Sequence, residues 1–280
     1  MERITSRQNA IVKRFRDLAR TSRAQLRGDH AAQAGLTADV LLDGEHLVQE
    51  ALACGIPIDV AAFSERQLTN VLSPIARIAK DVKKRGGRVL TVGEPVLAAI
   101  SPVQHPSGVV AIARARPADV GVVMSALSEL PVMLVLAGVQ DPGNVGAIIR
   151  AAAAFNASGV IAIDGSANPF SWKALRGAMG ATFRIPIAAR STIPEVITSA
   201  QDHRVRLIAA VPRGGTPLPE LNLLEPAAIV LGGEGAGLPP ELMAAAHETV
   251  TIPMHGPIES LNVAVAAALI LYEASRQRRT

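Results

Sequence analysis

The chain has 280 residues, of which 49% are hydrophobic and 2% are aromatic, and its formal net charge is +4. This length and composition exclude global disorder and predict one large or two medium globular domains. The scarcity of aromatic residues excludes base stacking as the main route to a nucleic acid, and the single cysteine, Cys54, excludes a disulfide framework and a cysteine-rich zinc site.

The charge is distributed unevenly along the chain. Residues 1–116 contain 17 Lys and Arg against 11 Asp and Glu, whereas residues 117–280 contain 11 against 13. A basic module joined to a near-neutral one fits a polyanion-binding domain attached to a catalytic domain. A solvated basic helix surface is the alternative, and charge by itself leaves both interpretations open.

No segment predicts export or membrane insertion. Residues 1–20 lack the apolar core of a signal peptide. No stretch of 18 apolar residues runs without a charge or a helix breaker. We therefore expect a soluble, cytoplasmic protein without a membrane partner.

Helices and strands alternate over the first part of the chain. A basic helix is predicted over residues 5–27, where Ile11, Val12 and Phe15 belong to an apolar stripe. Strands are predicted at 40–42, 58–63, 88–92 and 109–113, and helices at 44–55, 73–85 and 94–100. This alternation predicts a small α/β domain over residues 1–115. Residues 116–130, with Pro117 and weak periodicity, are interpreted as a linker with room for one helical turn.

A second α/β domain is predicted over residues 131–280. The continuous apolar run 132–137 is typical of a parallel strand that is buried on both faces. Further strands are predicted at 159–163, 206–211, 227–231 and 250–252, and residues 184–187 are expected to lead into another strand. Helices are predicted at 144–155, 172–179, 193–203, 239–246 and 261–276. Residues 263–272 are apolar all round, so the last helix is either buried on all faces or lies in an oligomer interface.

Two polar residues follow the first strand of this second domain. Asn144 stands at the expected N-cap of the next helix, and Arg150 lies on a helix face made of small residues, which a ligand or a second chain can approach closely. Ligands of open α/β sheets bind beyond the carboxyl ends of the strands, which favours a functional role for both residues. A structural cap and a surface arginine are the alternative.

A glycine-rich turn, Gly232-Gly233-Glu234-Gly235-Ala236-Gly237, follows the strand at 227–231. Glycines let a ligand approach the main chain closely. The spacing matches neither the dinucleotide-binding fingerprint nor the P-loop. Because Glu234 would repel phosphate, a neutral or cationic ligand fits this turn better. A purely structural connection ahead of Pro239 is the alternative.

The start of the last helix carries a third polar group. Ser260 is expected to cap that helix, with Asn262 in its first turn. The sequence has no nucleophile elbow of a hydrolase, and its histidines lack the spacing of a metal site. Neither hydrolysis nor a metal centre is therefore predicted.

Three motifs occur in order along residues 131–280. They are Asp141 to Arg150, Leu231 to Leu238, and Ile252-Pro253-Met254 with Ser260-Leu261-Asn262-Val263. On these motifs the domain resembles the SpoU (TrmH) branch of the SPOUT RNA methyltransferases. The segment Leu175 to Ala181 is similar to a family helix with a Met-Gly pair. Residues 1–115 resemble the ribosomal-protein-like RNA-binding domain that often precedes this catalytic domain.

The resemblance implies a cofactor, an acceptor and an assembly. These are S-adenosylmethionine as methyl donor, a ribose 2′-hydroxyl of RNA rather than DNA, a homodimer whose site both subunits build, and a trefoil knot that wraps the cofactor. The implied cofactor-binding residues are Leu231, Gly232, Gly233, Glu234, Gly237, Ile252, Met254 and Leu261. The implied catalytic residue is Arg150, and Asn144, Glu234, Ser260 and Asn262 complete the catalytic site.

The chemistry agrees with these implied roles. A ribose hydroxyl is a poor nucleophile near neutral pH and needs a positioned base or a nearby positive charge. Because arginine normally stays protonated, we hypothesise that Arg150 stabilises developing negative charge or positions a phosphate. A role of Arg150 as the base stays open.

The leading hypothesis is 2′-O-methylation of ribosomal RNA, with 23S ribosomal RNA as the preferred target and the basic domain docking through phosphates and shape. The same chemistry on tRNA is an alternative, which the extra N-terminal domain disfavours. A housekeeping target and an antibiotic-resistance target are both compatible with the sequence. A non-catalytic RNA-binding protein on the same fold is a different class. A nucleotide-dependent dehydrogenase is a remote one, which the missing dinucleotide fingerprint opposes.

Overall fold

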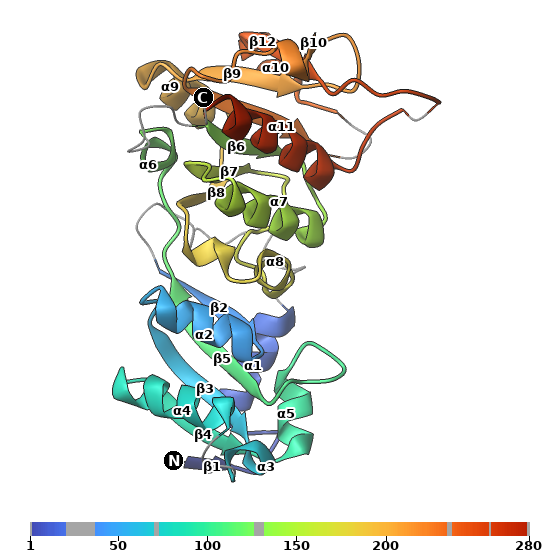
Figure 1. Ribbon diagram of the computed structural model, residues 1–280. Coiled ribbons are helices and arrows are strands. Elements are labelled where there is room, and N and C mark those ends of the chain that lie inside the picture. Colours follow the sequence, from blue (N-terminus) through green and yellow to red (C-terminus); the bar gives the residue numbers. More distant parts are fainter. Residues whose placement is uncertain are drawn as a thin grey trace. The chain divides into compact units, whose positions relative to one another are not determined.

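The computed structural model describes residues 2–20, 37–69, 73–125, 132–233, 237–257 and 259–278 (Figure 1). Contacts divide the chain into two compact units. Unit 1 comprises Met1–Arg116 and Phe170–Phe183, and unit 2 comprises Pro117–Pro169 and Arg184–Thr280. Within the described ranges, no helix combines the length and the hydropathy needed to cross a bilayer.

Unit 1 is built on a mixed five-stranded sheet. Its strands are β1 (Glu2–Ile4), β2 (Ala38–Asp43), β3 (Ile58–Ser64), β4 (Arg88–Val92) and β5 (Val109–Ala115). Their order in the sheet is β1-β4-β3-β5-β2. Strands β1, β4 and β3 are parallel, whereas β5 runs antiparallel to both β3 and β2. The four predicted strands are present, and the three-residue edge strand β1 is an addition to them.

The helices of unit 1, apart from α3, bury apolar side chains against this sheet or against one another. They are α1 (Ala10–Arg20), α2 (Glu45–Ala53), α3 (Glu65–Leu68), α4 (Pro74–Lys84), α5 (Glu94–Ile100) and α8 (Trp172–Ala178), with the 3-10 helix η2 (Ala181–Phe183). Phe15 of α1 is fully buried in a core shared with β3, β4 and α5. Helix α1 begins at Ala10 rather than at residue 5, because the side chain of Asn9 accepts a hydrogen bond from the N–H of Ile11. The predicted continuation to residue 27 lies outside the described residues.

Helix α8 packs in unit 1 although its neighbours in sequence belong to unit 2. Nε1 of Trp172 donates to the carbonyl oxygen of Ala19 at 3.1 Å. The ring of His46 contacts the carbonyl oxygen of Met179 at 3.2 Å, where the helix ends in a left-handed residue with φ of 51°. The family-like segment Leu175 to Ala181 is therefore held by contacts with the N-terminal part of the chain.

Unit 2 is built on a seven-stranded sheet in which every pairing is parallel. Its strands are β6 (Val132–Ala137), β7 (Gly159–Ile163), β8 (Ile187–Ser191), β9 (Arg206–Ala210), β10 (Thr216–Pro217), β11 (Ala227–Gly232) and β12 (Glu248–Thr251). Their order is β10-β12-β9-β11-β6-β7-β8. The predicted α/β fold with a parallel C-terminal sheet is thereby confirmed.

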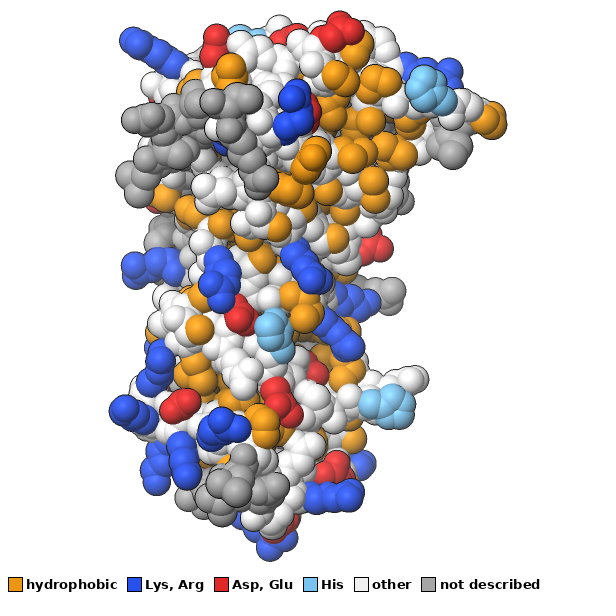
Figure 2. Space-filling model, viewed as in Figure 1, with side chains coloured by type: hydrophobic (Ala, Val, Ile, Leu, Met, Phe, Trp, Pro, Cys, Tyr) orange, Lys and Arg blue, Asp and Glu red, His pale blue; other side chains and the backbone are white. Residues whose placement is uncertain are grey.

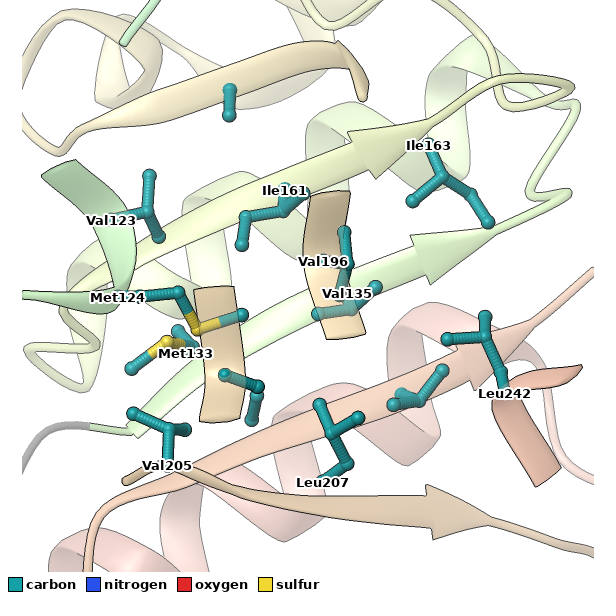
Figure 3. Packing of buried hydrophobic residues seen from close by; sticks show 14 of the residues in the cluster. Val123, Met124, Met133, Val135, Ile161, Ile163, Val196, Val205, Leu207 and Leu242 are labelled. Carbon is teal, nitrogen blue, oxygen red and sulfur yellow. The ribbon is translucent and has the colours of Figure 1, made fainter. Parts of the chain in front are cut away.

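Helices cover both faces of the parallel sheet (Figure 1). They are α6 (Val120–Met124), α7 (Pro142–Ala154), α9 (Ile193–Asp202), α10 (Pro240–Ala245) and α11 (Val263–Gln277), with the 3-10 helix η3 (Leu218–Glu220). Alternate strand residues such as Met133, Val135 and Ile161 form one buried cluster with side chains of α6, α9 and α10 (Figure 3). Helices α7 and α11 pack together against β6, β7 and β11 on the other face. The region interpreted as a linker contains α6, whose Val123 and Met124 are buried in this cluster.

Candidate functional site

A cavity of about 580 Å³ lies in unit 2 at the carboxyl ends of β9, β11 and β12. This edge of an open parallel sheet is where ligands of α/β proteins bind. Seven of the eight residues implied to bind the cofactor line it: Leu231, Gly232, Gly233, Gly237, Ile252, Met254 and Leu261. The eighth, Glu234, lies outside the described residues. Segments separated by about thirty residues in the sequence thus meet at one cavity.

The glycine-rich turn brings main chain close to main chain. The N–H of Gly233 donates to the carbonyl oxygen of Ala137 at 2.9 Å, and Gly233 pairs with Gly237 in an antiparallel bridge. A Cβ atom on Gly233 would lie 1.9 Å from the carbonyl oxygen of Gly138, and one on Gly232 would lie 3.0 Å from the carbonyl carbon of Gly237. Close approach, rather than an unusual φ, therefore requires glycine at position 233 and favours it at position 232.

A buried serine fixes the neighbouring strand end. The hydroxyl of Ser166 donates to the carbonyl oxygen of Leu136 and accepts from the N–H of Gly138, each at 2.9 Å. Gly138 is the residue against which Gly233 packs. Ser166 thus fixes the main chain against which the glycine-rich turn packs. The sequence did not indicate this role, because Ser166 lies in a loop.

Helix α7 begins one turn earlier than predicted. Asp141, not Asn144, is its N-cap, and the Asp141 carboxylate accepts from the N–H groups of Gly143 and Asn144. Pro142 explains the shift, because proline at the first helical position already has the φ of a helix and needs no hydrogen-bond acceptor. Asn144 consequently lies in the first turn, where its side chain is available for another partner.

Helix α11 requires the same kind of correction. Its N-cap is Asn262 rather than Ser260, and the Asn262 side-chain oxygen accepts from the N–H groups of Ala264 and Val265 at 2.9 and 3.3 Å. The Asn262 amide donates to Oδ1 of Asn144 at 3.1 Å. Ser260 lines the cavity instead. The structure therefore brings together Asn144 and Asn262, which lie 118 residues apart in the sequence.

Helices α7 and α11 run side by side in the same direction. The link between Asn144 and Asn262 joins their starts, and near their ends the rings of Phe155 and Tyr272 meet edge to face at 6.1 Å between centroids. The start of α11 also contributes Val263 to the cavity wall. Both helix N-termini, with their partial positive charge, consequently lie near the cavity edge of the sheet.

Arg150 lies on the exposed side of α7, together with Ala147 and Ala154. It does not line the cavity within the described part of a single chain. Six residues separate it from Asn144, which corresponds to about 9 Å along a helix axis. One chain by itself therefore assembles the cavity and the asparagine pair but leaves Arg150 on its outer surface.

Several cavity residues were not predicted from the sequence. Ala210, Val211 and Pro212 follow β9, and Met243 comes from α10. The rule that ligands bind beyond the carboxyl ends of parallel strands would have found the segment after β9. Among the described residues, no group of three or more His, Cys, Asp or Glu side chains is arranged to hold a metal ion.

Known proteins resemble both parts of the chain. Residues 131–272 match the SpoU rRNA Methylase family, and residues 41–118 match a domain described as RNA 2′-O ribose methyltransferase substrate binding. A Synechocystis protein described as an uncharacterized tRNA/rRNA methyltransferase is 32% identical over 98% of this chain and 94% of its own length. The Bacillus subtilis 23S rRNA (guanosine(2553)-2′-O)-methyltransferase RlmP is 30% identical over 97% of this chain and 98% of its own.

A solved structure agrees with these similarities. An AdoMet-bound rRNA methyltransferase from Sinorhizobium meliloti superposes with a TM-score of 0.82 at 31% identity, and the match covers 99% of this chain and 98% of that one. The family match spans more than half of the chain. The resemblance drawn from the three motifs is thereby confirmed, and the chain belongs to the SpoU rRNA methylase family.

Proposed function

We propose that this protein transfers a methyl group from S-adenosylmethionine to a ribose 2′-hydroxyl of RNA, with 23S ribosomal RNA as the preferred substrate. The observation that carries the proposal is the cavity at the glycine-rich turn, which seven of the residues implied to bind the cofactor line together. Support comes from the family, and from relatives described as an rRNA methyltransferase with bound AdoMet and as a 23S rRNA 2′-O-methyltransferase. A cytoplasmic location follows from such a substrate.

The cavity fits a small organic cofactor. Its volume of about 580 Å³ lies within the range of roughly 300–1,000 Å³ that is usual for small-molecule sites. We assign the adenosine part to main-chain groups near Gly232, Ile252 and Leu261, which line the cavity. Glu234, beyond the described residues, belongs to the same proposed site. When bound, S-adenosylmethionine supplies the methyl group.

The outer side of α11 supports a homodimer. Val265, Leu269 and Tyr272 are 48%, 40% and 56% exposed, and their spacing places them along one side of the helix. Figure 2 shows hydrophobic side chains gathered over the region where Figure 1 draws α11. Such a stripe on a soluble domain marks an interaction surface. We propose that a second copy covers this stripe. We also propose that Arg150, which is exposed on the neighbouring helix α7, then lies at the cavity of the other copy.

This arrangement gives Arg150 a chemical role. A protonated guanidinium beside the ribose would stabilise negative charge that develops on the 2′-oxygen, or hold a neighbouring phosphate. The hydrogen bond between the side chains of Asn262 and Asn144 would hold the start of α7 in place beside the cavity. Ser260 would contact the substrate or cofactor from the cavity wall.

The proposal is tested by transfer of radiolabelled methyl groups to unmodified ribosomal RNA and, in parallel, to tRNA. We expect label in ribosomal RNA, recovered in an alkali-resistant dinucleotide because a methylated 2′-oxygen cannot attack the next phosphate. Arg150→Ala should lower the rate about 100- to 1,000-fold, as removal of one charge-stabilising group usually does, and leave cofactor binding intact. Arg204→Asn is the matched control, because it removes an exposed guanidinium at a turn with positive φ that asparagine tolerates.

Label in tRNA alone would show that the substrate is tRNA rather than ribosomal RNA. No label in either RNA would contradict the proposed activity. Mixed dimers test the shared site. The assay uses an S-adenosylmethionine concentration that saturates the wild type but not Gly233→Ala, so that the Arg150→Ala and Gly233→Ala chains are each strongly impaired alone. When mixed, they should regain up to about a quarter of wild-type activity, because half of the dimers are mixed and one of their two sites is intact. No recovery in verified mixed dimers would place Arg150 and the cavity of one site on the same chain.

A further inference from the structure

One cation of the two basic helices of unit 1 is paired with carboxylates, whereas the other cations of α1, Lys13, Arg16 and Arg20, form no ion pair with a described residue. In α1, Nη2 of Arg14 lies 2.7 Å from a carboxylate oxygen of Asp39, and Nη1 contacts the carboxylate of Asp59. These hydrogen bonds, that to Asp39 above all, raise the pKa of Arg14 above its ordinary value. The central cation of α1 is therefore already neutralised by acidic residues of β2 and β3.

Helix α4 presents cations without such partners. Arg77, Lys80, Lys83 and Lys84 are exposed, and their side chains form no ion pair or hydrogen bond with any described residue. The opposite side of α4, including Ile78, is buried, so the rotation of the helix about its axis is fixed. We call these four cations the α4 face. Figure 2 shows Lys and Arg side chains over the region at the lower left where Figure 1 draws α4.

The spacing of the α4 face suits a polyanion. Arg77, Lys80 and Lys84 follow the i, i+3, i+7 pattern and form a row about 10 Å long, with Lys83 beside it. Asp81 is the only acidic residue of the helix. Long cationic side chains on a rigid helix contact phosphates and position a nucleic acid without reading its bases. The low aromatic content of the chain agrees with such binding by charge and shape.

We propose that the α4 face is the surface on which unit 1 docks the phosphate backbone of the RNA substrate. The proposal rests on the proposed function and adds the place of contact. Helix α4 lies within residues 41–118, the segment that matches an RNA substrate-binding domain, whereas α1 lies outside that match. The α4 face thus carries positive charge without ion-pair partners among the described residues, and it lies in the segment that matches an RNA substrate-binding domain.

The test compares two triple variants with the same change in charge. R77Q/K80Q/K84Q neutralises the α4 face, and K13Q/R16Q/R20Q neutralises three cations of α1 while sparing the paired Arg14. Binding of the full chain to an unmodified ribosomal RNA fragment is measured at several salt concentrations, and thermal unfolding checks that both variants fold. We expect the α4 variant to bind about tenfold more weakly or worse, and its log–log salt slope to become shallower by about 2–3, because each lost phosphate contact contributes about 0.9.

The α1 variant should change affinity and slope less, and methyl transfer by the α4 variant should show a raised KM for RNA with kcat retained. Equal losses in both variants, or no loss in the α4 variant, would overturn the proposal. So would binding to anionic lipid vesicles through the same residues without binding to RNA. The two proposals fail separately: α4-dependent RNA binding without methyl transfer contradicts only the activity, and methyl transfer that is indifferent to α4 contradicts only the docking surface.

Discussion

Unit 2 and unit 1 offer their partners different kinds of surface. The cavity of unit 2 is lined by main chain and by apolar side chains such as Leu231 and Met254, and its glycine-rich turn packs at close range against Gly138. Its helix α11 exposes an apolar stripe, whereas α4 of unit 1 exposes a row of long cations. Both helices bury one side on their own sheet, so the difference lies in their outer sides.

The comparison separates recognition by shape from recognition by summed charge. A close-packed turn loses its geometry, and with it the binding of its ligand, when one atom is added, because the tight packing and the main-chain hydrogen bonds allow little movement. A cationic face loses affinity in steps, because each phosphate contact contributes a similar, salt-dependent share. A single substitution in the cavity of unit 2 should therefore change ligand affinity strongly. A single substitution of a cation of unit 1 should change RNA affinity only slightly.

The largest effect is expected for Gly233→Ala. The new Cβ would lie 1.9 Å from the carbonyl oxygen of Gly138, so the end of β11 must move away from β6. We expect S-adenosylmethionine to bind about 10- to 100-fold more weakly, in line with about 1–3 kcal/mol for an overpacked site. Isothermal titration calorimetry measures this change.

Gly121→Ala is the matched control, because its Cβ would meet nothing nearer than His203 at 3.9 Å. Gly232→Ala, with neighbours at 3.0 Å, should fall between the two. Unchanged cofactor affinity in a folded Gly233→Ala variant would show that the cavity is not the cofactor site.

The apolar stripe of α11 should give the next largest effect. Leu269→Glu places a charge that a covering second copy would bury without a partner, so the dimer should dissociate and methyl transfer should fall at least about tenfold. Sedimentation velocity measures the assembly. Val122→Glu is the control, because Val122 is similarly exposed, at 53%, on α6, which packs with α9 on the face of the sheet opposite α11. A wild-type monomer, or a variant that stays dimeric and active, would remove the proposed interface.

The sequence predicted the elements of unit 2 well where one signal dominates. The runs at β6, β7 and β11 are apolar on both faces of a buried parallel sheet, and each was predicted to within a residue of its observed bounds. Helix caps were harder, because several polar residues compete within one turn. Asp141 precedes Pro142 and takes the cap that was assigned to Asn144, and Asn262 takes the one assigned to Ser260.

Long-range placement could not be predicted from local patterns. No periodicity indicates that α8 packs in unit 1 by way of Trp172, or that Asn144 meets Asn262. The cavity residues after β9 are ordinary apolar residues whose role depends on the order of the strands. The roles of the site residues and the trefoil knot implied by the resemblance stay predictions.

The smallest effect is expected at a charge inside unit 1. Burial raises the pKa of Asp43, against the opposing effects of the Ser101 hydroxyl, which donates at 2.6 Å, and of the Arg176 charge. A carboxyl whose pKa is higher in the folded chain than in the unfolded chain costs stability when it is ionised. This cost is present above the raised pKa and disappears as the pH falls below the unfolded value of about 3.9.

Asp43→Asn removes that ionisation and keeps an oxygen that can accept from Ser101. We therefore expect a slightly higher Tm than wild type near about pH 8, by no more than about 2 °C, and a smaller difference near about pH 3.5, where the carboxyl is protonated in the folded chain. Differential scanning calorimetry at both pH values measures it. Asp81→Asn makes the same chemical change at an exposed position of α4 and should show no such trend. If the Asp43→Asn variant is instead less stable at the higher pH, attraction to Arg176 outweighs burial, and charge pairing rather than desolvation decides the local energetics of unit 1.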